Sequence, residues 1–196
     1  DYKDLRIVPG FIDIHCHGAY GYDTNDGEPE GLKNWTKNIV QEGVVGLLST
    51  TLTQYKSVLM KAVKNVADVV KEDDYEGARI LGIHFEGPYL DMKWKGAQPP
   101  EAIVSPSVEE FKEYQKAADN LIKIITMAPE HDPEFALTRY ASQHGTIVSI
   151  GHSNATFQEA MMAVANGASS VTHTYNAQTP FTHRANGIVG LAFRLH

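Results

Sequence analysis

Short apolar runs alternate along the chain with longer stretches in which apolar residues recur every three or four positions. The short runs are rich in Val and Ile and contain few polar residues, as expected for strands that are buried on both faces of a sheet. We therefore predict six strands, in residues 6–15, 43–53, 78–87, 120–130, 145–153 and 168–176.

The longer stretches have the pattern of amphipathic helices. Between residues 55 and 70, one apolar stripe lies opposite lysines and acidic residues. Ser107, followed three residues later by Glu110, predicts a capping box at a helix start. Asp132 directly before Pro133 predicts a second helix start, with proline at the first helical position.

Strands that alternate with helices indicate an α/β fold of right-handed βαβ units with a parallel sheet. No linker, low-complexity tract or short repeat divides the chain, so we expect one domain over residues 1–196. Six such units fit an open doubly wound sheet or most of a (β/α)8 TIM-type barrel. The alternation alone leaves both open.

Composition limits the classes of partner. The chain has 196 residues, 42% hydrophobic and 21% charged, which is typical of a globular protein. Its formal net charge of -7 argues against nucleic acid or an anionic membrane as the main partner, although a local basic pocket could still bind a small anion. A single cysteine, no signal peptide and no long apolar run lead us to expect a cytoplasmic protein.

Histidines gather at the ends of the predicted strands. Active sites of barrel enzymes form at the carboxyl ends of strands, from residues of several different strands. Imidazole and carboxylate donors together suit zinc, iron and similar divalent ions. The residues concerned are His15, His17, His84, Glu86, His152 and His173. Their common location favours a barrel with a metal site.

His15 and His17 are two residues apart at the end of one predicted strand. Side chains alternate between faces along a strand, so both imidazoles should point the same way and Cys16 the opposite way. This spacing fits a pair of metal ligands, but also a pair of structural histidines bonded to the backbone. Cys16 is expected to be a small buried residue rather than a redox or catalytic thiol.

Four motifs, in this order, resemble the successive barrel motifs of the N-acetylglucosamine-6-phosphate deacetylase family in the amidohydrolase superfamily: "PGFIDIHCHG", "HFEGPYL", "GHSNA" and "HTYNA". The resemblance runs from about residue 6 to the end of the chain. It implies a (β/α)8 barrel of the metal-dependent hydrolase kind, of which about six βα units are present. Residues 1–196 would then be an incomplete barrel domain, without the last two units and without the family's small β-sandwich domain.

The resemblance also implies a set of metal ligands. Glu86, His152 and His173 match the ligands of the principal ion, and His15 and His17 match the H-x-H that supports a second ion in some members. One or two divalent ions, zinc or iron, are therefore expected. His84 and Glu130 have no ligand role in the family pattern, and we predict structural roles for both.

The loop "YNAQTPFTHRANG" resembles the family's substrate-binding loop. There, Asn176 and the backbone of Ala177 would contact a sugar phosphate and Arg184 would bind the phosphate group. Gln98 stands where members often carry histidine and is expected to contact substrate. The implied reaction hydrolyses the N-acetyl group of N-acetylglucosamine 6-phosphate to glucosamine 6-phosphate and acetate. The family's catalytic aspartate would lie beyond His196, so this chain alone is expected to be inactive.

Two alternatives stay open. The chain could belong to another amidohydrolase that acts on a different amide, such as N-acetylgalactosamine 6-phosphate or a cyclic amide. It could also be a metal-binding polypeptide without catalysis, because no candidate for the catalytic aspartate was identified. The resemblance further implies a homodimer.

Overall fold

Six parallel strands form one sheet in the computed structural model, which describes residues 6–194. Their order in the sheet, β1-β2-β3-β4-β5-β6, is their order along the chain. The strands are β1 Phe11–Cys16, β2 Val44–Thr51, β3 Arg79–Glu86, β4 Ile122–Met127, β5 Ile147–Ile150 and β6 Ala168–Val171.

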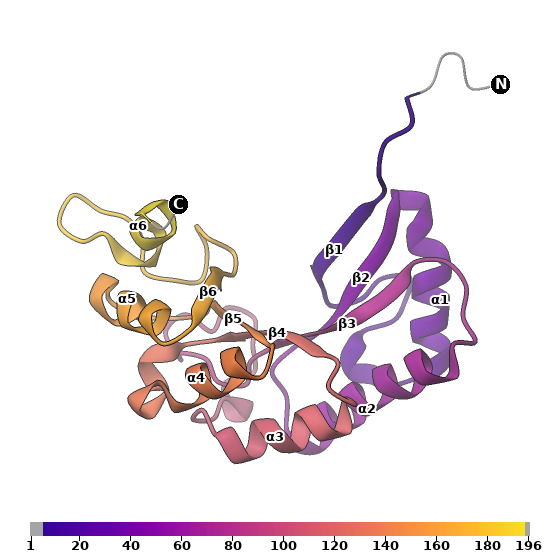
Figure 1. Ribbon diagram of the computed structural model, residues 1–196, viewed down its shortest axis with the longest axis horizontal. Coiled ribbons are helices and arrows are strands. Elements are labelled where there is room, and N and C mark those ends of the chain that lie inside the picture. The colour runs from indigo at the N-terminus through magenta and orange to yellow at the C-terminus, as the bar shows by residue number, and fades with distance from the viewer. Residues whose placement is uncertain (1–5, 195–196) are drawn as a thin grey trace.

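Helices alternate with these strands and lie along one side of the sheet (Figure 1). The α-helices are α1 Pro29–Ile39, α2 Lys56–Glu72, α3 Val108–Ala117, α4 Ala136–Gln143, α5 Phe157–Ala165 and α6 Gly187–Arg194. Short 3-10 helices cover Thr24–Asp26, Val40–Glu42, Pro100–Ala102, Pro129–His131 and Pro133–Phe135. Within residues 6–194, no helix combines the length and apolar character needed to cross a membrane.

The strand order separates the two folds that the alternation left open. A doubly wound sheet reverses its strand order at a switch point and carries helices on both faces. Here each strand pairs with the next one along the chain, and the sheet curls with β1 and β6 at its two ends (Figure 1). The observed architecture is therefore a curled half-barrel of TIM type.

All six predicted strands are present, with shorter bounds. β2 and β3 are buried at nearly every position, as their continuous apolar runs predict. β1 starts only at Phe11, after Pro9 and Gly10, and all its residues are exposed or half-buried. β1 is more exposed than β2 and β3 because it is an edge strand of the sheet, with a single neighbouring strand.

The helix start predicted at Ser107 is correct, whereas the start predicted at Pro133 begins only a short 3-10 helix, and α4 starts at Ala136. Ser107 Oγ accepts from the amide of Glu110 at the start of α3, but the predicted capping box is not formed. The Glu110 carboxylate instead accepts from the Tyr89 hydroxyl at 2.8 Å. Asp132 also caps a helix, but it reaches past the short turn at Pro133 and accepts from two amides in the first turn of α4.

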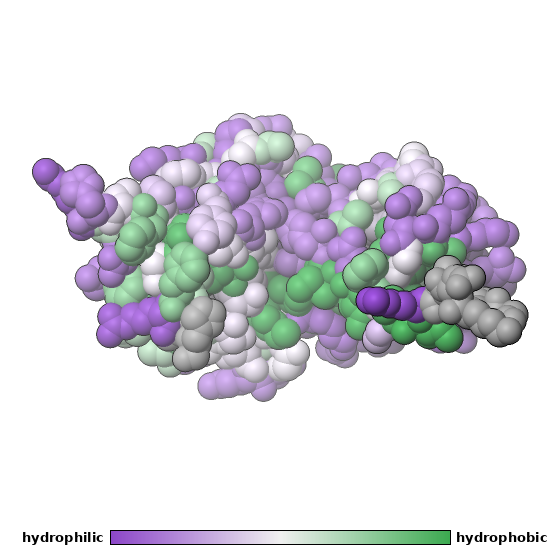
Figure 2. All heavy atoms as spheres, turned by 90° about the horizontal axis from the view of Figure 1, so that it is seen from above, coloured by the Kyte–Doolittle hydropathy of each residue, from purple (hydrophilic) through white to green (hydrophobic). Residues whose placement is uncertain are grey.

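The core lies between the sheet and the helices. Its large, fully buried side chains include Trp35, Leu59, Phe85, Phe111 and Tyr114. The other face of the curled sheet is open, and apolar atoms are visible among the polar ones when the molecule is seen from above (Figure 2). Along β1 the exposed apolar residues are Phe11, Ile12 and Ile14.

Candidate metal centre

Glu86 is the centre of a group of histidines at the carboxyl end of the sheet. It ends β3 and is only 1% exposed. Its Oε1 atom lies 3.2 Å from His152 Nε2 and 3.1 Å from His173 Nε2. The predicted principal ligands, which come from three different strand ends, are thus brought together around one carboxylate.

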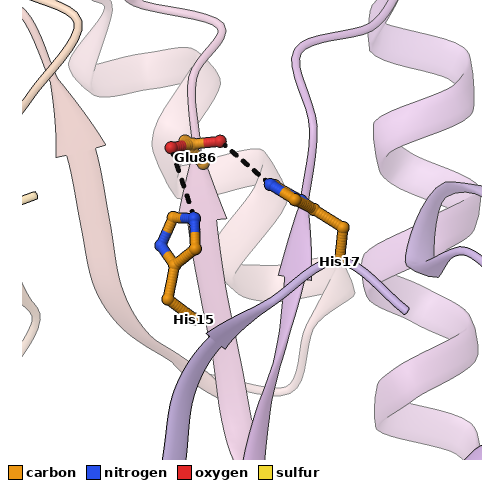
Figure 3. Close-up of side chains that lie close together, drawn as sticks. All are labelled: His15, His17 and Glu86. Carbon is orange, nitrogen blue, oxygen red and sulfur yellow. Dashed lines mark ion pairs between the residues drawn. The ribbon is translucent and has the colours of Figure 1, made fainter. Parts of the chain in front are cut away.

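His15 in β1 and His17, which directly follows this strand, face the same carboxylate (Figure 3). His15 Nε2 lies 3.5 Å from Glu86 Oε1, and His17 Nε2 lies 3.3 Å from Glu86 Oε2. Cys16 packs against the core on the other side, and burial raises the pKa of its thiol, which disfavours the reactive thiolate. The alternation predicted along "HCH" is correct.

Two turns bring the remaining histidines to the site. His152 follows β5 and His173 follows β6, and both have left-handed backbone conformations, with φ of 48° and 64°. Residues other than glycine rarely adopt this conformation, and such positions gather at active and ligand-binding sites. The turns direct both imidazoles at Glu86 after the regular strands have ended.

Backbone carbonyls determine which ring nitrogen of two histidines is free. His17 Nδ1 donates to the Thr50 carbonyl at 3.2 Å, and His152 Nδ1 donates to the Trp94 carbonyl at 2.8 Å. Because a carbonyl can only accept, Nδ1 carries the hydrogen, and the neutral ring presents a lone pair at Nε2. In both rings this lone pair faces a carboxylate oxygen, an arrangement that requires a proton or a cation between them.

The ionisation of these groups agrees with an anionic site. Burial would raise the pKa of the Glu86 carboxyl, but hydrogen bonds from His152, His17 and His173 hold it below its ordinary value. Burial likewise opposes protonation of His17 and His152, yet the contact with Glu86 raises the pKa of both rings. For His15 burial is the larger effect, and its pKa is lowered.

The donor atoms form two overlapping triads that suit a divalent ion. Glu86, His152 and His173 form one, and His15, His17 and Glu86 form the other, each with its donor atoms within 4.8 Å of one another. Neutral imidazoles and a carboxylate are donors that zinc and iron accept. His15 and His173 also line a pocket of about 230 Å³ on the open side of the sheet.

His84 shares a strand with Glu86 but does not face its carboxylate. It is 3% exposed, its Nδ1 lies 2.8 Å from the Ile14 carbonyl, and its Nε2 lies 2.6 Å from Thr126 Oγ1. Burial lowers its pKa to about 4, so the ring is neutral at neutral pH. Both nitrogens are engaged in hydrogen bonds, which supports the structural role predicted for this residue.

Gln98 reaches the centre from the loop between β3 and α3. Its side chain is buried, its Oε1 accepts from the Thr53 amide at 2.7 Å, and its Nε2 donates to Glu86 Oε2 at 2.8 Å. The Thr53 amide fixes the orientation of the Gln98 amide, because a backbone N–H must face an oxygen. Sequence reasoning expected a substrate contact here and did not foresee the contact with Glu86.

Replacing Gln98 with methionine, of similar length, should weaken binding of Zn²⁺ about tenfold. The loss is expected because groups that hydrogen-bond a metal ligand fix its orientation, and their removal typically costs 10–100-fold in affinity. Titration of the metal-free protein with Zn²⁺ measures the effect, without substrate. Gln143→Met, at an exposed position of α4, is the matched control. An affinity equal to that of the control would show that Gln98 does not orient Glu86.

Asn176 and Ala177 lie in the loop that follows His173. The Asn176 amide donates to the His173 carbonyl at 3.3 Å, and the Ala177 carbonyl accepts from the Ser153 amide at 3.3 Å. The loop after β6 is therefore joined to the loop after β5, beside the principal triad. The position is compatible with the predicted sugar-phosphate contact.

Arg184 is not brought to the metal centre. It is exposed and lines a separate pocket of about 420 Å³ with residues such as Thr156, Thr179 and Asn186. None of the five candidate ligands lines this pocket. A role for Arg184 in binding phosphate thus stays a prediction.

A third group of possible ligands was missed by sequence reasoning. Asp91, Glu130 and His131 have donor atoms within 4.8 Å of one another. His131 Nε2 contacts Asp91 Oδ2 at 2.8 Å, while Glu130 accepts from Ser153 Oγ at 2.7 Å and from the amide of Asn154. These bonds connect the loops after β3, β4 and β5, which agrees with the structural role predicted for Glu130.

Comparison with known proteins shows that nearly the whole chain is similar to amidohydrolases. The model of the Amidohydrolase family matches residues 6–191. An N-acetylglucosamine-6-phosphate deacetylase of Bacillus subtilis is 42% identical over 191 residues, which are 96% of this chain and 48% of that protein. An N-acetylgalactosamine-6-phosphate deacetylase of Escherichia coli O157:H7 is 33% identical over 96% of this chain and 50% of its own length.

Solved structures with a similar fold are also found. N-acetylglucosamine-6-phosphate deacetylase of Thermotoga maritima has a TM-score of 0.84 and 32% identity, over 95% of this chain and 49% of that chain. The enzyme of Mycobacterium smegmatis has a TM-score of 0.86 and 28% identity, over 93% and 47%. The chain thus spans about half the length of the relatives it matches. With its half-barrel and its glutamate–histidine cluster, the chain belongs to the amidohydrolase family.

Proposed function

We propose that the protein hydrolyses the N-acetyl group of N-acetylglucosamine 6-phosphate to glucosamine 6-phosphate and acetate. The observation that carries this proposal is the cluster of four imidazoles around Glu86, at the edge of the sheet where barrel enzymes build their sites. The relatives named above, which include N-acetylglucosamine-6-phosphate deacetylases, support the choice of substrate.

In this proposal the principal ion is held by Glu86, His152 and His173, and a second ion by His15 and His17 together with Glu86. A bound zinc or iron ion supplies Lewis acidity toward an amide carbonyl and lowers the pKa of water. The backbone carbonyls that accept from His17 and His152 keep the Nε2 lone pairs available at the centre. These residues would hold an ion at the carboxyl end of the sheet, where the acetamido group would bind.

The substrate's phosphate would be bound away from the metal, by the loop after β6. Asn176 and the backbone of Ala177 would contact the sugar phosphate, and Arg184 would supply a guanidinium, which binds phosphate bidentately. Gln98 would contact the substrate while holding Glu86.

The rest of the enzyme is part of the same proposal. The six βα units would belong to a closed (β/α)8 barrel, in which residues 1–196 are an incomplete domain without the β-sandwich and the last two units. A catalytic aspartate beyond His196 would protonate the leaving amine. A homodimeric state and a cytoplasmic location without nucleic-acid or membrane partners stay predictions.

Acetate release tests the proposal directly. The protein extended through the expected aspartate, loaded with Zn²⁺ or Fe²⁺, should release acetate from N-acetylglucosamine 6-phosphate, and the 196-residue chain alone should not. Release by the short chain would refute the requirement for an aspartate beyond His196. No release by the extended protein with either ion would refute the deacetylase assignment.

N-acetylgalactosamine 6-phosphate is a second candidate substrate, favoured by the likeness to the deacetylase of Escherichia coli O157:H7. The two sugars differ only in the configuration of one hydroxyl group. Assays of kcat/KM for both phosphates, under one set of conditions, decide between them.

In the protein extended through the expected aspartate, Arg184→Ala should lower kcat/KM for the phosphorylated sugar about 10- to 100-fold. It should change kcat/KM little for unphosphorylated N-acetylglucosamine. The expectation follows from the loss of a charge-assisted hydrogen bond to phosphate, worth about 1.5–3 kcal/mol. Arg139→Ala, at an exposed arginine of α4, is the control. An equal loss with both sugars would contradict phosphate binding by Arg184.

A further inference from the structure

The backbone around His15 is irregular. Between Asp13 and Cys16 the pairing of β1 with β2 shifts, because three steps along β1 match two steps from Leu47 to Ser49. Such a bulge adds one residue to a strand, disturbs the ladder and re-aims a side chain, and bulges are frequent beside active sites.

Side chains bond three backbone groups at this bulge. The His15 amide donates to Asp13 Oδ1 at 3.0 Å, and the Cys16 amide donates to Thr50 Oγ1 at 3.0 Å. The Ile14 carbonyl accepts from His84 Nδ1 at 2.8 Å. The end of β1 is therefore held by side chains where its regular pairing shifts.

Of these contacts, the one from His84 crosses a strand. His84 belongs to β3, and β2 lies between β3 and β1 in the sheet. The His84 ring also packs edge-on against the His15 ring, with centroids 4.7 Å apart and an interplanar angle of 90°. One buried residue thus contacts both the backbone before His15 and its imidazole.

The Ile14 carbonyl sets the direction of a chain of hydrogen bonds. Since this carbonyl only accepts, His84 Nδ1 carries the hydrogen, and the neutral ring accepts at Nε2 from the Thr126 hydroxyl. Thr126 has then used its only hydrogen, so it accepts from Thr172 at 2.7 Å. By the same argument Thr172 accepts from Ser149 at 2.7 Å.

This directed chain runs from β5 and the end of β6 through β4 and β3 to β1. Its side chains are buried, with exposures of 7% or less for Ser149, Thr172, Thr126 and His84. A fully satisfied polar network in the interior fixes the positions of its members, because any break leaves a buried group unpaired. His84 is the member that transmits this constraint to the strand of the H-x-H pair.

We propose that His84 is a positioning residue, which holds the β1 bulge so that His15 and His17 face Glu86 and form the second ion site. The inference rests on the proposed metal centre and not on the identity of the substrate. Without the imidazole, the Ile14 carbonyl would lose its partner and His15 the ring against which it packs. The triad of Glu86, His152 and His173 has no ligand on β1 and should be unaffected.

Zn²⁺ binding tests the proposal in the metal-free protein, with isothermal titration calorimetry and elemental analysis. The unaltered protein should bind two ions. In His84→Leu, which cannot donate, the first ion should bind normally and the affinity for the second should fall about 10- to 100-fold. In His84→Asn, whose amide nitrogen can replace Nδ1 as donor to Ile14, the second ion should bind within about threefold of the original affinity.

Several outcomes would overturn the proposal. They are an equal loss of both ions in His84→Leu, no loss in it, or no rescue in His84→Asn. Binding of one ion by the unaltered protein would leave His84 without a second site to support. Binding of no ion would instead refute the metal centre on which the proposed function depends.

The ring itself provides a measurement that needs no substitution. In ¹⁵N nuclear magnetic resonance spectra, His84 should show the Nδ1–H tautomer with an unprotonated Nε2. Thr126→Val, which removes the hydroxyl donor at nearly constant volume, should keep this tautomer, because the bond to Ile14 persists. An Nε2–H tautomer in the unaltered protein would contradict the direction of the chain and the anchoring of β1.

Discussion

Glu86→Gln is expected to abolish high-affinity binding of divalent metal, with at least a 100-fold loss of affinity for Zn²⁺. The expected loss is large because Glu86 belongs to both triads and is the one carboxylate in them. Glutamine retains the size of the side chain but removes its charge, and its amide NH₂ would face an imidazole lone pair. Elemental analysis after dialysis and titration with Zn²⁺ measure the effect.

Glu101→Gln is the matched control, since it makes the same change at an exposed glutamate in the short 3-10 helix between β3 and α3. It should leave metal content unchanged. If Glu86→Gln retained the metal content of this control while still folded by circular dichroism, the ligand assignment would be wrong for both ions. Acetate release by the same substitution in the extended protein would separately contradict a metal-dependent reaction at this cluster.

The candidate ligands were predictable because they depend on the ends of strands, which the sequence displays clearly. Runs of Val and Ile located all six strands, and the carboxyl ends of parallel strands meet at one edge of a sheet. The four candidate histidine ligands therefore converge on Glu86, as expected. His152 and His173 converge although they lie beyond the regular strands, on left-handed turns that no pattern of alternation describes.

Hydrogen bonds from the site's histidines to backbone carbonyls were not predictable in the same way. The carbonyls of Thr50 and Trp94 fix the tautomers of His17 and His152, and any residue type offers a carbonyl. The capping box at Ser107 failed for a related reason, because Tyr89, distant in sequence, takes the Glu110 carboxylate. Such hydrogen-bond partners depend on the tertiary structure, and local composition and spacing do not predict them.

The choice between two α/β architectures also lay outside the local pattern. Alternating strands and helices are common to doubly wound sheets and barrels. The order of the strands separates them, and that order depends on which strand each βαβ unit pairs with. The resemblance of the motifs indicated a barrel, and the sequential order is in agreement with it.

Gly87→Ala is expected to destabilise the protein by roughly 2–5 kcal/mol and to weaken Zn²⁺ binding at least tenfold. Gly87 directly follows Glu86 and has a φ of 74°, in the left-handed region, where another residue costs about 1–2 kcal/mol. A Cβ atom there would overlap Thr53 Oγ1 and lie 3.2 Å from Leu90 Cδ1, and overpacking of this kind costs about 1–3 kcal/mol. Relief of the clash would move the backbone of Glu86. Urea unfolding and Zn²⁺ titration measure the two effects.

A double-mutant cycle with Thr53→Ala separates the clash from the backbone cost. Thr53 is 1% exposed and its hydroxyl lacks a hydrogen-bond partner among the described residues, so its removal alone should cost little. Combined with Gly87→Ala, it should restore about 1–3 kcal/mol and most of the Zn²⁺ affinity, while the cost of the left-handed alanine persists. Strictly additive effects would show that Gly87 is required for its conformation alone. They would also show that the close approach of Thr53 does not position Glu86.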